Sequence, residues 1–131
     1  MRVLIVDDEV AARQRLRHDL GKLDGVDVVG EAEDGLEALE AIDRLQPDLV
    51  LLDIQMPGLD GFEVLELLEA RPTVIFVTAH DEFALQAFEV GAAAYLPKPV
   101  TRSRLGEALK RAPLRRSGGG NPQLHALRSN R

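Results

Sequence analysis

Five short apolar runs rich in β-branched residues recur along this chain of 131 residues. They cover residues 3–6, 26–29, 49–52, 74–77 and 93–96. Each run has the length of one strand, and all but the second, which contains Asp27, carry no charged residue. Such runs are typical of parallel strands that helices cover on both sides. These runs predict an α/β fold built around a parallel sheet.

The segments between the runs have the apolar spacing of helices. One example is the series Leu36, Leu39, Ile42 and Leu45. The spacing predicts helices over residues 10–22, 36–45, 61–70, 82–90 and 102–111, separated by turn-forming pairs. Because crossovers are right-handed and both faces need cover, we expect a doubly wound (βα)5, flavodoxin-like parallel sheet with strand order 2-1-3-4-5.

The charge balance and the lack of cysteine limit the kinds of partner and of site that this chain can have. The chain has 16 Lys and Arg against 22 Asp and Glu, a formal net charge of −6. Direct binding to nucleic acid or to an anionic membrane needs a basic surface, so neither is expected of this domain. The absence of cysteine excludes disulfides, thiol nucleophiles and thiolate metal sites. No signal peptide or apolar run of roughly 18 residues is recognisable, so we expect a cytoplasmic protein.

The composition changes after about Arg111. The stretch that follows is rich in Gly, Ser, Pro and Arg and has almost nothing to bury. We therefore expect a single domain over residues 1–112. Residues 113–131 are expected to form a flexible linker or tail.

The predicted topology brings three carboxylates to one place. In such sheets, ligands bind beyond the carboxyl ends of the strands where the strand order reverses, here between strands 1 and 3. Asp7 and Asp8 follow strand 1, and Asp53 follows strand 3. Two like charges about 4 Å apart repel by about 4 kcal/mol at an effective dielectric near 20, so a cation is required. Mg²⁺ suits a small set of oxygen ligands completed by water. The simpler interpretation is that these residues cap a helix or begin a turn.

Two further residues follow the neighbouring strands. Thr78 ends strand 4, and Lys98 follows strand 5 between Pro97 and Pro99, which hold its backbone extended. Taken alone, the threonine is a candidate helix cap and the lysine a surface charge. Together with the carboxylates they supply a hydroxyl donor and a fixed cation, the requirements for phosphoryl transfer onto an aspartate.

Four segments at these spacings resemble the receiver domain of two-component response regulators. They are Val3-Leu4-Ile5-Val6-Asp7-Asp8-Glu9, Leu51-Leu52-Asp53-Ile54-Gln55-Met56-Pro57-Gly58, Val77-Thr78-Ala79 and Leu96-Pro97-Lys98-Pro99. The resemblance covers the chain from Met1 to about Arg111.

This resemblance implies a role for each site residue. Asp53 would be the phosphoacceptor, Asp7 and Asp8 would bind Mg²⁺ with it, and the backbone carbonyl of Gln55 would complete the protein ligands. Lys98 would pair with the phosphoryl oxygens.

The resemblance also implies a switch. Thr78 and Tyr95 would form it, with the hydroxyl moving to the phosphoryl group and the ring turning inward. The Lys98-Pro99 bond is expected to be cis. His80 is either a surface turn residue or, with Gln55, a residue that tunes the access of water to the phosphoryl group.

A finer likeness links residues 78–89 to regulators of the LytTR class. It implies a β-rich DNA-binding output domain, absent from this chain, and hence a role in transcription regulation. The expected partners are a sensor histidine kinase and a second copy docked through helix 4, strand 5 and helix 5; DNA would be contacted only through the missing domain. The domain itself is expected to be a signalling module and not an enzyme.

Four alternatives stay open. The first is a stand-alone or phosphorelay receiver without DNA-binding output. The second is an aspartate-nucleophile phosphatase, although that class carries its nucleophile after the first strand in an Asp-x-Asp pattern. The third is a flavin or nucleotide binder, which Asp7-Asp8-Glu9 opposes because such binders favour Ser, Thr and Gly there. The fourth is a receiver fold used only as a scaffold.

Overall fold

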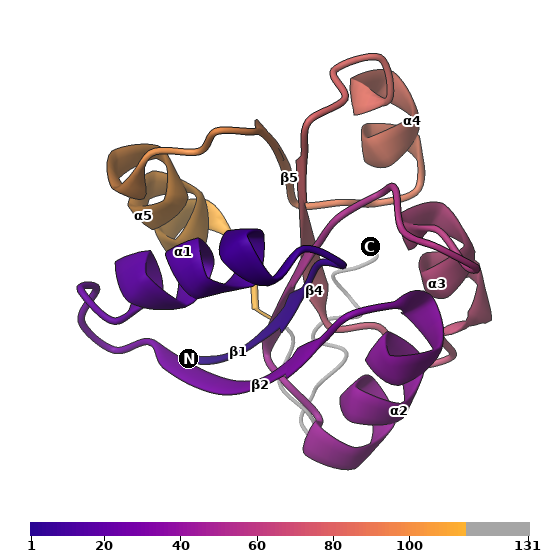
Figure 1. The fold of residues 1–131 in the computed structure, drawn as a ribbon, viewed down its shortest axis with the longest axis horizontal. Helices are drawn as coiled ribbons and strands as arrows, with labels where there is room; N and C mark the ends of the chain where they lie inside the picture. The colour runs from indigo at the N-terminus through magenta and orange to yellow at the C-terminus, as the bar shows by residue number, and fades with distance from the viewer. Residues whose placement is uncertain (115–131) are drawn as a thin grey trace, which may run out of the picture.

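The strands form one parallel sheet. A computed structural model describes residues 1–114 and gives the strand order β2-β1-β3-β4-β5, which confirms the predicted order (Figure 1). The strands are β1 (Arg2–Val6), β2 (Asp27–Ala32), β3 (Leu49–Leu52), β4 (Thr73–Thr78) and β5 (Ala94–Pro97). Strand β2 extends three residues beyond the predicted end because its pairing with β1 continues as far as Val6 and Ala32.

Five helices cover the two faces of the sheet. They are α1 (Val10–Leu20), α2 (Gly35–Leu45), α3 (Gly61–Leu67), α4 (Ala84–Glu89) and α5 (Arg102–Arg111). Helices α1 and α5 lie on one face, and α2, α3 and α4 lie on the other (Figure 1). The fold class predicted from the sequence is therefore confirmed.

Two helix boundaries differ from the prediction. Helix α3 ends at Leu67 and not at residue 70, because Leu68 is already extended and Pro72 disfavours a helical conformation at the residue before it. Helix α4 begins at Ala84, two residues later than predicted, and has no side-chain cap. The predicted spans of the other helices agree with the structure to within two residues.

The core is divided by the sheet into two layers. On the α1–α5 side, Leu16 and Leu105 pack against the strand side chains that face these two helices, such as Ile5 and Ile75. On the other side, Ile42 and Val64 pack against Phe76, which is fully buried in β4. All four residues of β3 are buried, as expected for a central strand covered on both faces.

Side-chain caps fix the starts of three helices. The side chains of Asp34, Asp60 and Thr101 accept hydrogen bonds from backbone N–H groups at the starts of α2, α3 and α5. Helix α1 differs, because its N-cap residue Glu9 makes no side-chain cap hydrogen bond.

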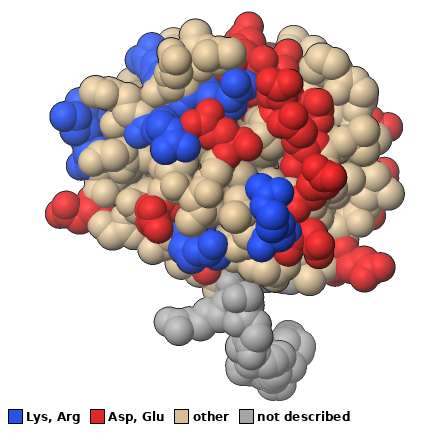
Figure 2. Space-filling view, turned by 60° about the horizontal axis from the view of Figure 1, so that its bottom comes forward, with Lys and Arg blue, Asp and Glu red and all other residues tan. Residues whose placement is uncertain are grey.

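Charge is distributed unequally between the two faces of the sheet. Helices α2 and α3 carry Glu37, Glu40, Asp43, Glu63 and Glu66. Helices α1 and α5 are rich in Arg and Lys. Figure 2 shows one view in which acidic side chains form a band beside a more basic region.

The described chain ends next to the start of β4. The hydroxyl of Thr73 donates a hydrogen bond to the backbone carbonyl of Pro113. The expected flexible tail lies almost wholly outside the described residues, so it stays a prediction. Among helices in residues 1–114, none has the length and apolar character needed to cross a membrane.

Candidate phosphoryl-transfer site

Three carboxylates meet at the carboxyl ends of β1 and β3. Asp7, Asp8 and Asp53 each offer an oxygen, and these oxygens lie within 4.8 Å of one another. Asp7 and Asp53 are buried, with 1% and 6% of their surface exposed, whereas Asp8 is exposed. Neither Asp7 nor Asp8 is the N-cap of α1, since that position belongs to Glu9. The simple capping interpretation therefore does not account for the cluster.

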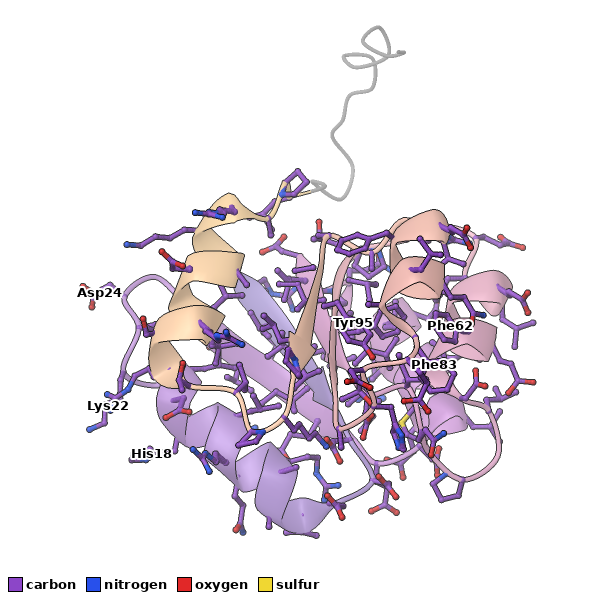
Figure 3. The ribbon with its side chains drawn as sticks, turned by 90° about the horizontal axis from the view of Figure 1, so that it is seen from above. His18, Lys22, Asp24, Phe62, Phe83 and Tyr95 are labelled. Atoms are coloured by element: carbon purple, nitrogen blue, oxygen red, sulfur yellow. The ribbon has the colours of Figure 1, made fainter. Side chains whose placement is uncertain are left out.

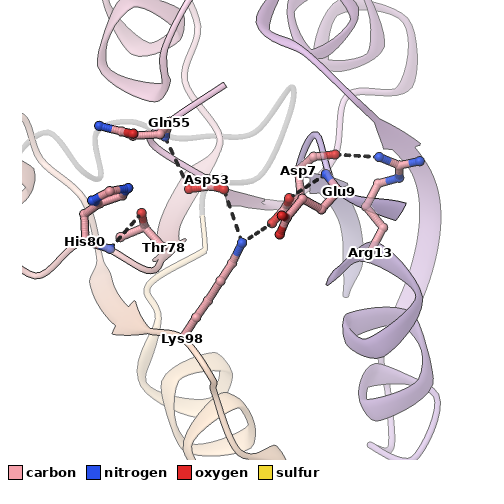
Figure 4. Close-up of polar contacts among 8 residues, drawn as sticks. All are labelled: Asp7, Glu9, Arg13, Asp53, Gln55, Thr78, His80 and Lys98. Atoms are coloured by element: carbon pink, nitrogen blue, oxygen red, sulfur yellow. Dashed lines mark hydrogen bonds and ion pairs between the residues drawn. The ribbon is translucent and has the colours of Figure 1, made fainter. Parts of the chain in front are cut away.

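Lys98 bridges two of these carboxylates. Its Nζ atom lies 2.7 Å from Oδ2 of Asp7 and 3.2 Å from Oδ2 of Asp53 (Figure 4). Burial disfavours the charged ammonium, but the hydrogen bond to Asp7 and the charges of Asp53 and Asp7 outweigh it, so the pKa of Lys98 is raised. Lys98 is therefore held as a cation inside the acidic cluster and is not a free surface charge.

The backbone around Lys98 is well defined. Pro97 ends the edge strand β5 opposite Thr78, and the N–H of Lys98 donates to the carbonyl of Thr78 at 2.8 Å. A proline is tolerated at this edge because no further strand needs its missing N–H. The Lys98-Pro99 peptide bond is cis, as the resemblance implied.

Thr78, Gln55 and His80 lie around the phosphoacceptor candidate. Thr78 is fully buried, and its Oγ1 accepts a long hydrogen bond of 3.4 Å from the N–H of His80. The N–H of Gln55 donates to Oδ1 of Asp53 at 3.3 Å, while the Gln55 side chain is exposed. Figure 4 shows Thr78, Gln55 and Lys98 arranged on different sides of Asp53. Since α4 begins beyond Phe83, Thr78 is not a helix cap.

Helix α3 approaches the backbone of Asp53 closely. The N–H of Gly61 donates to the carbonyl of Ile54 at 2.8 Å. A Cβ atom at Gly61 would lie 2.7 Å from the carbonyl oxygen of Asp53 and 3.0 Å from the ring of Phe76. Only glycine fits this contact, so the sequence pattern Asp60-Gly61 allows α3 to pack directly under the site.

Tyr95 lies on the α2–α3–α4 side of the sheet. Its ring packs against the same core as Phe62 and Phe83, which Figure 3 shows on this side of the molecule. Its hydroxyl is buried and, within residues 1–114, has no hydrogen-bond partner. Burial raises the pKa of Tyr95, and the charges of Glu82, Asp81 and Asp53 add to this against an opposing effect of the Phe83 backbone.

An open hollow of about 500 Å³ lies beside the carboxylates. It is lined by Asp8, Ile54, Gln55, Met56, Pro57, Gly58, Asp60, Phe62 and Phe83. A second hollow, of about 320 Å³, lies at the opposite end of the strands, where Pro72 and Gly91 precede β4 and β5. The first hollow leaves the exposed Asp8 accessible from solvent.

Another acidic group has a structural explanation. Glu33, Asp34 and Glu37 lie at the start of α2 and also present clustered oxygens. Asp34 accepts from the N–H of Glu37, and the Glu37 side chain accepts from the N–H of Glu33. These contacts form a helix cap, and within residues 1–114 no lysine contacts this group as Lys98 contacts the other one.

Arg13 contacts the backbone of Asp7, and this contact was not predicted from the sequence. Its Nη1 atom donates to the backbone carbonyl of Asp7 at 2.6 Å, and its Nε atom donates to Glu31 in β2 at 3.0 Å (Figure 4 shows the first contact). A sequence signal existed, since Arg13 lies one helical turn after Glu9 and so faces the turn that carries Asp7.

The donor set fits a hard divalent cation. Three carboxylate oxygens within 4.8 Å, two of them on buried side chains, match the oxygen ligands that Mg²⁺ takes from proteins. The adjacent ammonium and hydroxyl could neutralise and orient phosphoryl oxygens. The arrangement therefore suits transfer of a phosphoryl group to an aspartate.

Comparison with known proteins agrees with this geometry. The family model described as "Response regulator receiver domain" matches residues 3–110. The "Positive alginate biosynthesis regulatory protein" of Pseudomonas aeruginosa is 54% identical, over 95% of this chain and 57% of the relative. The "Transcriptional regulatory protein BtsR" of Salmonella typhi is 45% identical, over 89% of this chain and 50% of the relative. The chain thus spans about half the length of these relatives.

Solved structures show the same fold. The response regulatory domain of protein mrkE from Klebsiella pneumoniae superposes with a TM-score of 0.77 at 34% identity, covering 84% of this chain and 93% of that one. The response regulator domain of Thermotoga maritima CheB gives a TM-score of 0.73 at 34% identity, covering 84% and 89%. The expected likeness to LytTR-type regulators is confirmed as well. The chain belongs to the receiver domain family of two-component response regulators.

Proposed function

We propose that this domain is a Mg²⁺-dependent phosphoacceptor switch and that Asp53 receives a phosphoryl group from a sensor histidine kinase. The observation that carries the proposal is the cluster of three carboxylates within 4.8 Å, with Lys98 Nζ bonded to two of them. A capping role would not require a partly buried lysine, with 20% of its side chain exposed, between two buried aspartates. Phosphoryl transfer to an aspartate depends on positioning and on neutralising the charge of the transferred group, and this combination of charges supplies both.

Each residue has a distinct task in the proposed transfer. A carboxylate oxygen of Asp53 attacks phosphorus, an O–P bond forms, and the P–N bond to the donor imidazole breaks. The electron pair of the broken P–N bond stays on the imidazole nitrogen, which takes up a proton from solvent. Lys98 pairs with the phosphoryl oxygens. Asp7, Asp8, Asp53 and the backbone carbonyl of Gln55 would hold Mg²⁺, which supplies positive charge to the transferring group when bound.

The proposed switch involves Thr78 and Tyr95. The aspartyl phosphate would carry about −1.5 to −2 charge, and the buried hydroxyl of Thr78 would turn to donate to it. The buried Tyr95 hydroxyl makes no hydrogen bond of normal geometry within residues 1–114, so no such bond opposes a change in the position of its ring. His80 and Gln55 would tune the access of water to the phosphoryl group.

The proposed output surface consists of α4, β5 and α5. Leu85 and Phe88 of α4 are 73% and 58% exposed, which supports docking of a second copy there after phosphorylation. Sedimentation with and without a phosphoryl mimic such as beryllium fluoride with Mg²⁺ tests this step. A shift from monomer to dimer is expected, and an unchanged monomer would remove the dimer from the proposal.

We further propose that the domain controls a LytTR-type DNA-binding domain in a longer protein. The names of the relatives, which are regulatory proteins about twice as long as the aligned segment, support this role. The coding sequence beyond Arg131 tests it. A basic β-rich segment is expected there, whereas a stop codon would favour the stand-alone or phosphorelay alternative.

Phosphate incorporation tests the central proposal. Wild type, Asp53→Asn and the exposed control Asp43→Asn are incubated with a labelled small acyl phosphate and Mg²⁺. Wild type and Asp43→Asn should take up label, and Asp53→Asn should not. Label entering Asp53→Asn at the wild-type rate would rule out Asp53. Sustained hydrolysis of a generic phosphate ester, which we expect to be negligible, would instead favour the phosphatase alternative.

A further inference from the structure

The backbone of Asp7 is held by a residue outside the acidic cluster. Arg13 Nη1 donates to the Asp7 carbonyl at 2.6 Å, and the Arg13 side chain is only 12% exposed. Its Nε atom donates to Glu31 Oε1 at 3.0 Å. The guanidinium thus links the turn after β1 to the neighbouring strand β2, a task for which its fork of donors is suited.

All polar atoms of Asp7 are thereby engaged. Its N–H donates to the carbonyl of Ala32 at 3.1 Å, Oδ1 accepts from the N–H of Glu9 at 2.9 Å, and Oδ2 accepts from Lys98 at 2.7 Å. Arg13 supplies the partner of the remaining atom, the carbonyl oxygen. Removing Arg13 would leave the carbonyl of a residue that is 1% exposed without its charged donor.

The turn has little other support from α1. Glu9, the N-cap residue, makes no side-chain cap hydrogen bond. The helix is tied to the turn by its ordinary backbone bond from Arg13 N–H to Glu9 O at 3.1 Å and by the Arg13 guanidinium. Beside the bonds that Asp7 makes with Ala32, Glu9 and Lys98, the Arg13 guanidinium is therefore the side-chain link through which α1 supports the conformation of this turn.

We propose that Arg13 is a positioning residue: through its hydrogen bond to the Asp7 carbonyl it holds the turn of residues 7–9 in the shape that binds Mg²⁺. This inference rests on the proposed magnesium site. Groups that orient metal ligands without touching the metal commonly contribute 10–100-fold to affinity, so we expect an effect of about tenfold here.

Arg17 offers a matched control. It lies one turn further along α1 and its Nε atom bonds the other oxygen of Glu31, Oε2, at 2.6 Å. Its side chain is 49% exposed, and it has no hydrogen bond to Asp7. Arg13→Gln and Arg17→Gln each remove one positive charge and one bond to Glu31, but only Arg13→Gln removes the bond to the Asp7 carbonyl.

The sign of the effect separates positioning from simple electrostatics. Removing a positive charge near three carboxylates would, by Coulomb's law alone, tighten Mg²⁺ binding. If Arg13 positions the turn, Arg13→Gln must instead weaken binding, while Arg17→Gln leaves it unchanged or slightly tighter. Arg13→Lys keeps the charge but carries its donors on a single nitrogen, which cannot span both partners, so it should recover part of the lost affinity.

Isothermal calorimetry of the 131-residue chain with MgCl₂ measures these affinities. The Kd of Arg13→Gln should rise about tenfold and that of Arg17→Gln should stay within about twofold of wild type. An Arg13→Gln Kd equal to or below that of Arg17→Gln would overturn the inference. If Arg13→Gln does not fold, Arg13→Lys carries the same test against Arg17→Lys.

Amide spectra without metal separate this inference from the proposed function. In Mg²⁺-free samples labelled with ¹⁵N, the Asp8 and Glu9 resonances should move in Arg13→Gln and stay in place in Arg17→Gln. Unmoved resonances would contradict the positioning role. A wild-type chain that binds no Mg²⁺ would refute the proposed metal site, yet these spectra would still show whether Arg13 fixes the turn.

Discussion

The Nζ atom of Lys98 lies 2.7 Å from Oδ2 of Asp7, although 91 residues separate the two along the chain. The contact joins the ends of β1 and β5, which are not neighbours in the sheet. In the same position, Lys98 also reaches Asp53 at the end of β3. One ammonium therefore compensates charge contributed by two separate strands.

Replacing Lys98 by Met should destabilise the metal-free domain at pH 7, because two buried carboxylates lose their counter-charge. We expect about 1–3 kcal/mol, less than for a fully buried pair, because the Lys98 side chain is 20% exposed. Because the pKa of Lys98 is raised in the folded state, the stabilisation from its charge is complete below the usual lysine pKa of 10.5. This stabilisation is lost as the pH rises through the folded-state pKa. Urea unfolding measures it, with the exposed Lys110→Met as control. Added Mg²⁺ should shrink the difference, and equal stability of Lys98→Met and wild type without metal would contradict the prediction.

The ionisation of the Tyr95 hydroxyl can be measured directly by titration. It is the single tyrosine of the chain, which has no tryptophan, so phenolate absorbance reports this residue alone. The midpoint should lie above 10.0 in the folded protein because burial raises the pKa. In denaturant it should return to about 10. The raised value means that the neutral phenol stabilises the fold below this pH and that the stabilisation is lost as pH rises through the folded pKa. Coincident midpoints with and without denaturant would be inconsistent with the buried hydroxyl.

Two glycines in helices should respond oppositely to alanine. Gly61→Ala places a methyl group 2.7 Å from the Asp53 carbonyl oxygen and should cost about 1–3 kcal/mol. Gly106→Ala in α5 meets only Leu23 at 3.5 Å and should gain about 0.5–1 kcal/mol from higher helix propensity. Chemical denaturation of both variants checks the pair. A Gly61→Ala variant as stable as Gly106→Ala would show that α3 does not pack tightly against the Asp53 backbone.

The two acidic clusters should differ in their response to metal. We expect Mg²⁺ to raise the Tm of wild type, since a ligand that binds only the folded state stabilises it. Asp8→Asn should lose most of this increase, whereas Glu33→Gln, in the cluster that caps α2, should keep it. Thermal unfolding at several Mg²⁺ concentrations measures both. The opposite ranking would place the metal at the start of α2.

The fold, and the placement of the candidate site residues at one end of the sheet, could be predicted from local sequence patterns. Apolar runs mark the strands, and because parallel strands have their carboxyl ends on one side of the sheet, the sequence alone predicts that Asp7, Asp53 and Thr78 lie close together. These features depend on topology alone. They do not depend on the conformation of any one side chain.

The features that sequence could not supply depend on side-chain geometry. The bond from Arg13 to the Asp7 carbonyl requires a particular arginine conformation and the placement of Glu31 opposite Ile5. The buried hydroxyl of Tyr95 depends on how the ring packs near Phe83. The early end of α3 at Leu67 reflects the path that the chain must take into β4. Long-range packing of this kind leaves no periodic signal.

The hydrogen bond from the Thr73 hydroxyl to the Pro113 carbonyl fixes the exit of the described chain from the domain at the start of β4. Thr73 begins β4 and Thr78 ends it, so the exit and the acidic cluster lie at opposite ends of one six-residue strand, about 17 Å apart. A module attached after Pro113 starts beyond the reach of a side chain at Asp53. The proposed phosphorylation of Asp53 could therefore influence such a module only through the body of the domain, in which β4 directly joins the two ends.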